Sequence, residues 1–403
     1  MNKNIKLAVA GAVLALSATA ANAGIIIPAG EWTIDINGNV NAYYVHNNSS
    51  DSQTINGGLA NTKNTGGAGS NASSINTGLL PSWLGITGKS RQNDLDVEWT
   101  ISLQPGASAK AAIGGGGGNE NRQAYLSFGD KSWGTILLGK NLGQFGRDAI
   151  LNDMTLLGVG SQGIVGTAGG TTTTLGRIGT GFMYADFNGQ INYTTPNMSG
   201  FEATVGITQP LTSANADASN SAALGTTQKS PGYEGVVRYS FAANDVTGKI
   251  WAEAKGQQVS FTSTSKTENS WMTGIGANVK VAGFDLTGYY YNGEGAGTTA
   301  FLKDGYDVNH AKRDSDGGYV QALYTLPTKT KVGVSWGESN LDGNAVDAGT
   351  DLVKSNEMWT VGAYHPLTKS INLVAEYSRV ESESQVGNKN KSDIFDAGAI
   401  LFF

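Results

Sequence analysis

Residues 271–281 of the chain read WMTGIGANVKV, and this stretch decides the fold class. One set of alternate residues reads Trp, Thr, Ile, Ala, Val, Val, and the set between them reads Met, Gly, Gly, Asn, Lys. Because successive side chains of a strand point to opposite faces, a period of two over the whole stretch is typical of a β-strand. A helix would repeat its apolar positions every three or four residues. The stretch therefore predicts a strand with one apolar face.

The same alternation recurs along the chain and predicts an all-β protein. Sixteen strands are expected near residues 31–46, 81–89, 95–104, 121–129, 134–140, 188–195, 201–209, 233–241, 247–256, 270–281, 284–292, 317–326, 330–337, 357–365, 370–380 and 392–403. The composition agrees with a packed β protein, because 57 of the 403 residues are glycine and 8 are tryptophan. So many large rings argue against a disordered chain.

The connections between these strands alternate in length, which favours a transmembrane barrel. Short connections such as 242–246 and 282–283 alternate with long ones such as 47–80 and 141–187. Outer-membrane barrels have short periplasmic turns and long external loops. An even number of strands lets the first pair with the last, and lipid tolerates no open sheet edge. The pattern predicts an up-and-down antiparallel β-barrel of 16 strands, wide enough to hold water. Alternation alone also fits a half-buried soluble sheet.

The N-terminus has the pattern of a secretory signal peptide. Lys3 and Lys6 precede an apolar stretch at residues 7–16, and Ala-Asn-Ala at residues 21–23 is a small-x-small cleavage site. This arrangement predicts a cleaved signal peptide, residues 1–23, and export of the protein. Residues 24–403 then form a single transmembrane β-barrel domain.

Several classes of function are excluded by composition. The chain has no cysteine and three scattered histidines, so neither a thiolate metal site nor a nucleophile–base pair is expected. A formal net charge of −6 leaves no basic face for a nucleic acid. The GxGxxG match at residues 158–163 follows no strand and opens no helix, so it is not a nucleotide-binding loop. We therefore expect no enzyme, no cofactor and no metal.

The chain ends on Phe403, which shares an apolar face with Leu401 and Ala399. Here the sequence resembles the trimeric porins of Gram-negative bacteria over residues 31–403. The most specific stretches are residues 83–88, 121–125, 138–141, 148–150 and 176–179. The resemblance implies a homotrimer in the cell outer membrane, in contact with lipid and lipopolysaccharide. It also implies that the barrel assembly machinery recognises Phe403.

In that family the third long loop folds into the lumen and narrows the pore. Here the corresponding loop is the longest connection, about residues 141–180, and residues 148–157 carry apolar side chains that need a wall to pack on. An external loop that packs on a neighbour is the alternative. The resemblance places two acids of the constriction at Asp148 and Asp153, and two basic residues of the facing wall at Arg122 and Arg177. Each of these four could instead be a solvated charge or part of a structural ion pair.

The sequence departs from the family at three pore positions. Trp83 stands where a basic residue is usual on the second strand, Asn39 where one is common on the first, and Leu157 near a second loop acid. The pore constriction is therefore expected to have a weaker transverse field and a more apolar, aromatic lining. Lys89 and Lys140 could add positive charge.

The predicted function is passive diffusion of small hydrophilic solutes and ions through a water-filled channel. One alternative is a channel selective for aromatic or partly apolar small molecules. A second is a surface adhesin or β-scaffold that transports nothing.

Overall fold

The computed structural model describes residues 24–63, 71–107, 119–162, 173–211, 226–227, 229–262, 264 and 266–403. The predicted signal peptide lies outside these residues. Within them, all sixteen predicted strands are present: β2 (Trp32–Ser49), β4 (Trp83–Gln92), β5 (Leu95–Pro105), β7 (Ala124–Asp130), β8 (Gly134–Leu142), β9 (Phe187–Thr194), β10 (Phe201–Thr208), β12 (Gly232–Ala243), β13 (Val246–Phe261), β14 (Thr267–Val281), β15 (Phe284–Glu294), β16 (Asp314–Thr325), β17 (Lys331–Asp342), β18 (Val353–Pro366), β19 (Ile371–Ser384) and β20 (Lys389–Phe402).

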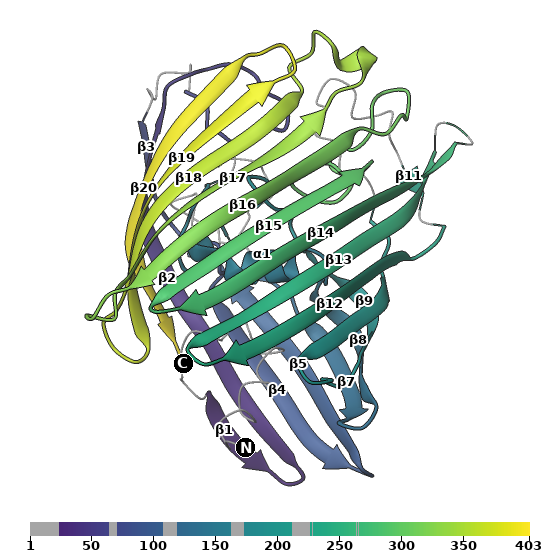
Figure 1. The fold of residues 1–403 in the computed structure, drawn as a ribbon, viewed down its shortest axis with the longest axis vertical. Coiled ribbons are helices and arrows are strands. Elements are labelled where there is room, and N and C mark those ends of the chain that lie inside the picture. The colour runs from purple at the N-terminus through teal and green to yellow at the C-terminus, as the bar shows by residue number, and fades with distance from the viewer. Residues whose placement is uncertain are drawn as a thin grey trace.

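These strands form one closed antiparallel barrel (Figure 1). Each strand pairs with the next along the chain, and β20 pairs back to β2 with Leu401 opposite Val40. Closure continues to the last residue, because the Phe403 amide donates to the Gly38 carbonyl and the Gly38 amide donates to the Phe403 carbonyl, at 3.0 and 2.9 Å. The sheet has no unpaired edge at this seam, as lipid requires.

Four short strands extend the sheet beyond the prediction: β1 (Ile25–Ala29), β3 (Asn71–Asn76), β6 (Asn119–Glu120) and β11 (Thr226–Thr227). β3 matters for the site, because it pairs with the upper part of β2 while β4 pairs with the lower part. Residues 77–82 between them leave the sheet, and Leu79 and Leu80 are buried. The expected strand at 81–89 therefore starts two residues later, at Trp83.

The two faces of the wall differ as the alternation predicts. The outer face exposes apolar side chains that include Val40, Ile101, Ile191, Ile250, Val320 and Val361. The inner face buries polar and aromatic side chains that include Asn41, Thr100, Gln190, Glu253, Tyr319 and Ser378. Aromatic pairs mark both ends of the apolar band. Phe284 and Tyr324 lie 4.7 Å apart near the short turns, and Trp336 and Trp359 lie 6.2 Å apart toward the long loops. Such girdles are typical of barrels in outer membranes.

Helical structure is limited to single turns among the described residues. α1 (Arg147–Asn152) and η2 (Met154–Leu157) lie in the connection between β8 and β9, and η3 (Ala345–Asp347) lies between β17 and β18. No helix in the described part of the chain is long and apolar enough to span a membrane. In Figure 1, α1 lies behind the front wall of strands rather than outside the barrel.

Candidate functional site

The connection between β8 and β9 is described over residues 143–162 and 173–186, and these residues are called the lumen loop here. Its backbone amides donate to inward-facing side chains of the opposite wall. Gly146 donates to Glu253 on β13 at 2.9 Å, and Met154 donates to Gln321 on β16 at 2.6 Å. Val159 and Gly160 both donate to Glu376 on β19 at 2.9 Å. The lumen loop therefore crosses the barrel from its own strands to the wall formed by β12 to β19.

Gly158 allows the closest approach of the lumen loop to this wall. A Cβ atom at this position would overlap the carboxylate of Glu376. Glu376 also accepts a hydrogen bond from the Tyr364 hydroxyl at 2.6 Å, so its carboxylate joins the loop to two strands. Directly opposite Glu376 on β20, Asp396 is also buried, and neither of its oxygens has a hydrogen-bond partner among the described residues.

Asp148, a predicted constriction acid, lies in the first turn of α1 and is buried. It accepts hydrogen bonds from Arg238 on β12, at 2.7 Å, and from Lys249 on β13. Burial alone would raise the pKa of Asp148, but the two cations outweigh it and lower the pKa to about 2. The carboxylate therefore stays ionised and holds α1 against the wall.

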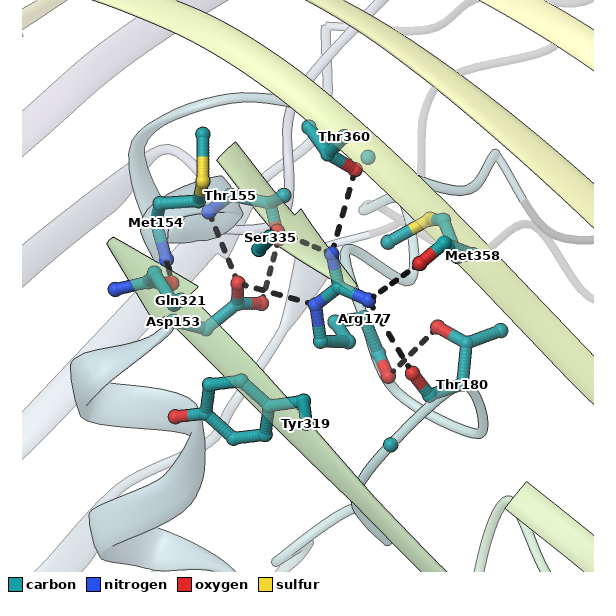
Figure 2. Close-up of polar contacts among 12 residues, drawn as sticks. Asp153, Met154, Thr155, Arg177, Thr180, Tyr319, Gln321, Ser335, Met358 and Thr360 are labelled. Carbon is teal, nitrogen blue, oxygen red and sulfur yellow. Dashed lines mark hydrogen bonds and ion pairs between the residues drawn. The ribbon is translucent and has the colours of Figure 1, made fainter. Parts of the chain in front are cut away.

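Asp153 and Arg177, both predicted site residues, lie together where the lumen loop meets β17 and β18 (Figure 2). Their side chains are 0% exposed, and Arg177 Nε lies 3.9 Å from Asp153 Oδ1. Arg177 donates to the Met358 carbonyl at 2.9 Å and to the hydroxyl of Ser335. Asp153 accepts from the Thr155 amide at 3.1 Å, which caps η2. Burial raises the pKa of Asp153 despite the nearby guanidinium.

This burial decides what the pair does. Neither charge has access to water in the lumen, so the pair joins the two limbs of the lumen loop to each other and to the wall. This geometry is that of an ion pair buried between the lumen loop and the wall.

Arg122 and Trp83 lie on the other side of the lumen loop, toward its own strands. Arg122 precedes β7, which begins at Ala124 rather than at the predicted residue 121. Its side chain is 12% exposed, and Nε donates to Glu120 at 2.8 Å. The guanidinium lies over the ring of Phe187, 5.5 Å from its centre.

Trp83 and Arg122 line one cavity of about 350 Å³ between the lumen loop and strands β4 to β9. Its apolar lining comes from Leu79, Leu80, Pro81, Trp83, Leu142, Ile150, Leu151, Leu156, Leu175, Ile178, Tyr184 and Phe187. Its charged lining comes from Glu120, Arg122 and Asp186. The structure thus separates the predicted site residues into a buried group on the far wall and a lining group at this cavity.

Lys89 and Lys140 lie on opposite faces of the barrel wall. Lys140 is exposed and lies opposite Gly189, on the face of β8 that carries Leu138 and its exposed partner Ile191, which is the outer face. Lys89 lies 3.5 Å from Glu98 and shares the inner face of β4 with Thr87. Of the two, only Lys89 is placed to add charge to the lumen side.

The sequence analysis missed the wall partners of the lumen loop, namely Glu234, Arg238, Lys249, Glu253, Gln321 and Glu376. All six are polar residues on the face of a predicted strand opposite its apolar face. That position was a usable signal for an inward side chain. Nothing in the spacing showed which of them the loop would reach. The described residues contain no group of three or more acids or histidines able to hold a metal ion.

The comparisons with known proteins agree with the barrel fold. A family model described as Gram-negative porin matches residues 8–385. The outer membrane channel DcaP of Acinetobacter baumannii superposes with a TM-score of 0.70 at 15% identity, covering 95% of this chain and all of that one. An anion-selective porin from Comamonas acidovorans gives 0.63 at 15% identity, covering 93% of this chain and 100% of that chain. Salmonella typhi OmpF, solved in complex with daunomycin, superposes with a TM-score of 0.58 at 14% identity. The match covers 94% of this chain and 100% of that chain. No curated protein matches the sequence.

Proposed function

This chain belongs to the Gram-negative porin family, and we propose that its water-filled passage for small hydrophilic solutes and ions is narrowed by the lumen loop. It is an outer-membrane channel for passive diffusion. The observation that carries the proposed constriction is the crossing of the lumen loop, whose amides bind Glu253, Gln321 and Glu376 on the far wall. Because these contacts hold the lumen loop against β13, β16 and β19, solutes pass on the side of the loop that faces away from these strands.

Within that constriction, Asp148, Asp153 and Arg177 have a structural role. Each is buried and bonded within the loop–wall contact, so its effect on a passing ion is indirect. Arg122 and Trp83 line the cavity between the lumen loop and strands β4 to β9, beside the passage, and they act on solutes directly. The field across this passage comes mainly from Arg122, Glu120 and Asp186.

The assembly proposed for the protein is a homotrimer. Its outer wall would meet lipid and, at the rim of the long loops, lipopolysaccharide. The apolar end of β20 supports recognition by the barrel assembly machinery, since Phe403 completes the seam with Gly38.

Conductance of the purified protein in a planar bilayer tests the channel and its assembly together. A trimer of open channels inserts with current that closes in three equal steps. Folded, heat-modifiable protein that inserts and carries no current at any voltage would overturn the proposal and favour a surface scaffold. A single closing step would leave the channel standing and contradict the trimer.

A further inference from the structure

We propose that the cavity between the lumen loop and strands β4 to β9 is a binding subsite for apolar amines, that is, small molecules with a ring-sized apolar body and an ammonium head. The proposal rests on the proposed function, because the ligand would reach this cavity through the channel. The volume of about 350 Å³ falls within the range of small-molecule pockets.

The apolar body is assigned from the lining. Ile150, Leu151 and Leu156 of the lumen loop line the cavity together with Leu79 and Leu80, although the inner wall elsewhere is rich in polar groups. These side chains do not fill the space between them. Apolar walls around an unfilled space gain from a ring that excludes water, because burial of apolar surface is favourable.

The head group is assigned from the charges at the same cavity. Arg122 is already engaged by Glu120 at 2.8 Å, by the Thr173 hydroxyl at 3.4 Å and by the Phe187 ring. Asp186 forms no ion pair with any described residue, and its Oδ1 accepts from the Phe187 amide at 2.7 Å. The lining therefore carries two acids and one cation.

This balance discriminates between head groups. An ammonium can pair with Asp186 and with the Glu120 oxygen that does not accept from Arg122 Nε. The ring of Trp83 also favours a cation. A carboxylate would have to displace Glu120 from Arg122 while facing Asp186. The cavity therefore selects amines over carboxylates of the same shape.

The subsite adjoins the passage, so occupancy should interrupt ion flow. Trp83 and Phe187 are half-buried rather than enclosed, and the Arg122 side chain is 12% exposed. The test measures interruption of a KCl current in a planar bilayer by benzylamine, benzyl alcohol and benzoate at equal concentrations. We expect the strongest interruption by benzylamine and the weakest by benzoate.

Asp186→Asn is the diagnostic variant. Asn tolerates the positive φ of 59° at this position and keeps an oxygen for the Phe187 amide. We expect the apparent affinity for benzylamine to fall about tenfold, as for loss of one charge-assisted hydrogen bond, and the affinity for benzyl alcohol to stay the same. The matched control, Asp245→Asn in the exposed turn between β12 and β13, should change neither affinity. Leu151→Asn, which makes the wall polar, should weaken all three compounds.

Each outcome decides one claim. If KCl passes but no ring compound interrupts the current, the subsite is refuted and the channel stands. If benzoate binds as tightly as benzylamine, or Asp186→Asn leaves benzylamine unaffected, the assignment of the head group is wrong. If folded protein passes no KCl, the proposed function itself fails.

Discussion

Arg177 is a charged residue that the family resemblance places at the pore constriction and that the structure buries. Its guanidinium lies 3.9 Å from Asp153 with both side chains fully buried. Removing one partner of a buried pair leaves the other charge without compensation. We expect Arg177→Met to lower the free energy of unfolding by about 3–5 kcal/mol. The double variant Arg177→Met with Asp153→Asn should lose less, since neither charge then remains.

The chain offers a matched control for this prediction. Arg379 lies 3.9 Å from Asp393 on the outer face, with the arginine side chain 51% exposed. Exposed pairs contribute about 0–1 kcal/mol, so Arg379→Met should change stability little. Urea unfolding of detergent-solubilised protein, followed by the gel shift of heat-modifiable forms, measures both. Equal losses for the two arginine variants would contradict the buried role of Arg177.

We expect the wild-type side chain of Asp396 to lower the stability of the barrel. It lies directly across from Glu376 and has no hydrogen-bond partner among the described residues. Two acids this close in a buried site cannot both ionise without a large cost. We expect Asp396→Asn to raise the free energy of unfolding by about 1 kcal/mol or more. Asp393→Asn on the outer face is the control, and a loss of stability in Asp396→Asn would refute this reading.

In the proposed channel Arg122 lies beside the passage, and its prediction concerns selectivity. Arg122→Gln removes the cation and leaves Glu120 and Asp186, so the reversal potential in a 0.1 M KCl gradient should shift toward cation preference. The shift should shrink at 1 M, where the screening length falls from ~10 Å to ~3 Å. Arg379→Gln, on the outer face, is the charge-matched control. An unchanged reversal potential in Arg122→Gln would show that the passage lies elsewhere.

At the scale of elements, α1 depends on one carboxylate. Arg238 and Lys249 lower the pKa of Asp148 to about 2, below the ordinary value of 3.8. A depressed pKa contributes stability that is present above pH 3.8 and is lost as the pH falls through about 2. The contribution is on the order of 2 kcal/mol.

The measurement compares wild type with Asp148→Asn from pH 7 to pH 2. The difference in free energy of unfolding should be constant above pH 5 and should narrow between pH 4 and pH 2. A difference that does not vary with pH would mean that Asp148 is not held ionised by the wall.

The strands were predictable because each presents one apolar face to lipid, and that periodicity survives in a single sequence. The residues at which the strands begin and end were less predictable. β14 begins at Thr267 rather than 270 and β16 at Asp314 rather than 317, because the hydrogen-bond ladder continues past the apolar band into polar sequence. The inward turn of residues 77–82 was not predictable. Its apolar Leu79 and Leu80 pack in the lumen, where the alternation predicts polar groups.

The site was less predictable than the wall. Family resemblance placed Asp148, Asp153 and Arg177 in the loop that crosses the lumen. Whether such a charge meets water depends on partners such as Arg238 and Met358, which lie on strands far along the chain. Trp83 pointed to an apolar, aromatic lining, and it does line the apolar cavity.

At the scale of the whole molecule, the C-terminal residue tests assembly. Phe403 exchanges two hydrogen bonds with Gly38, and its apolar face continues that of β20. Deletion of Phe403 should reduce the amount of heat-modifiable trimer in outer-membrane fractions severalfold. Phe403→Leu keeps the two backbone hydrogen bonds and an apolar terminal side chain. It therefore distinguishes the effect of the backbone pairing from the effect of the aromatic ring. Normal amounts of trimer after the deletion would contradict the proposed role.

The pairing of Leu401 with Val40 also has a consequence for the order of events in the cell. Closing the barrel joins β2 and β20, which lie far apart in the sequence, and the entropic cost of such long-range closure is met only at the end of folding. Until β20 pairs with both β19 and β2, the sheet has open edges, which lipid does not tolerate. We therefore expect that a chain without β20 has no stable place in the bilayer, so that insertion depends on the segment made last.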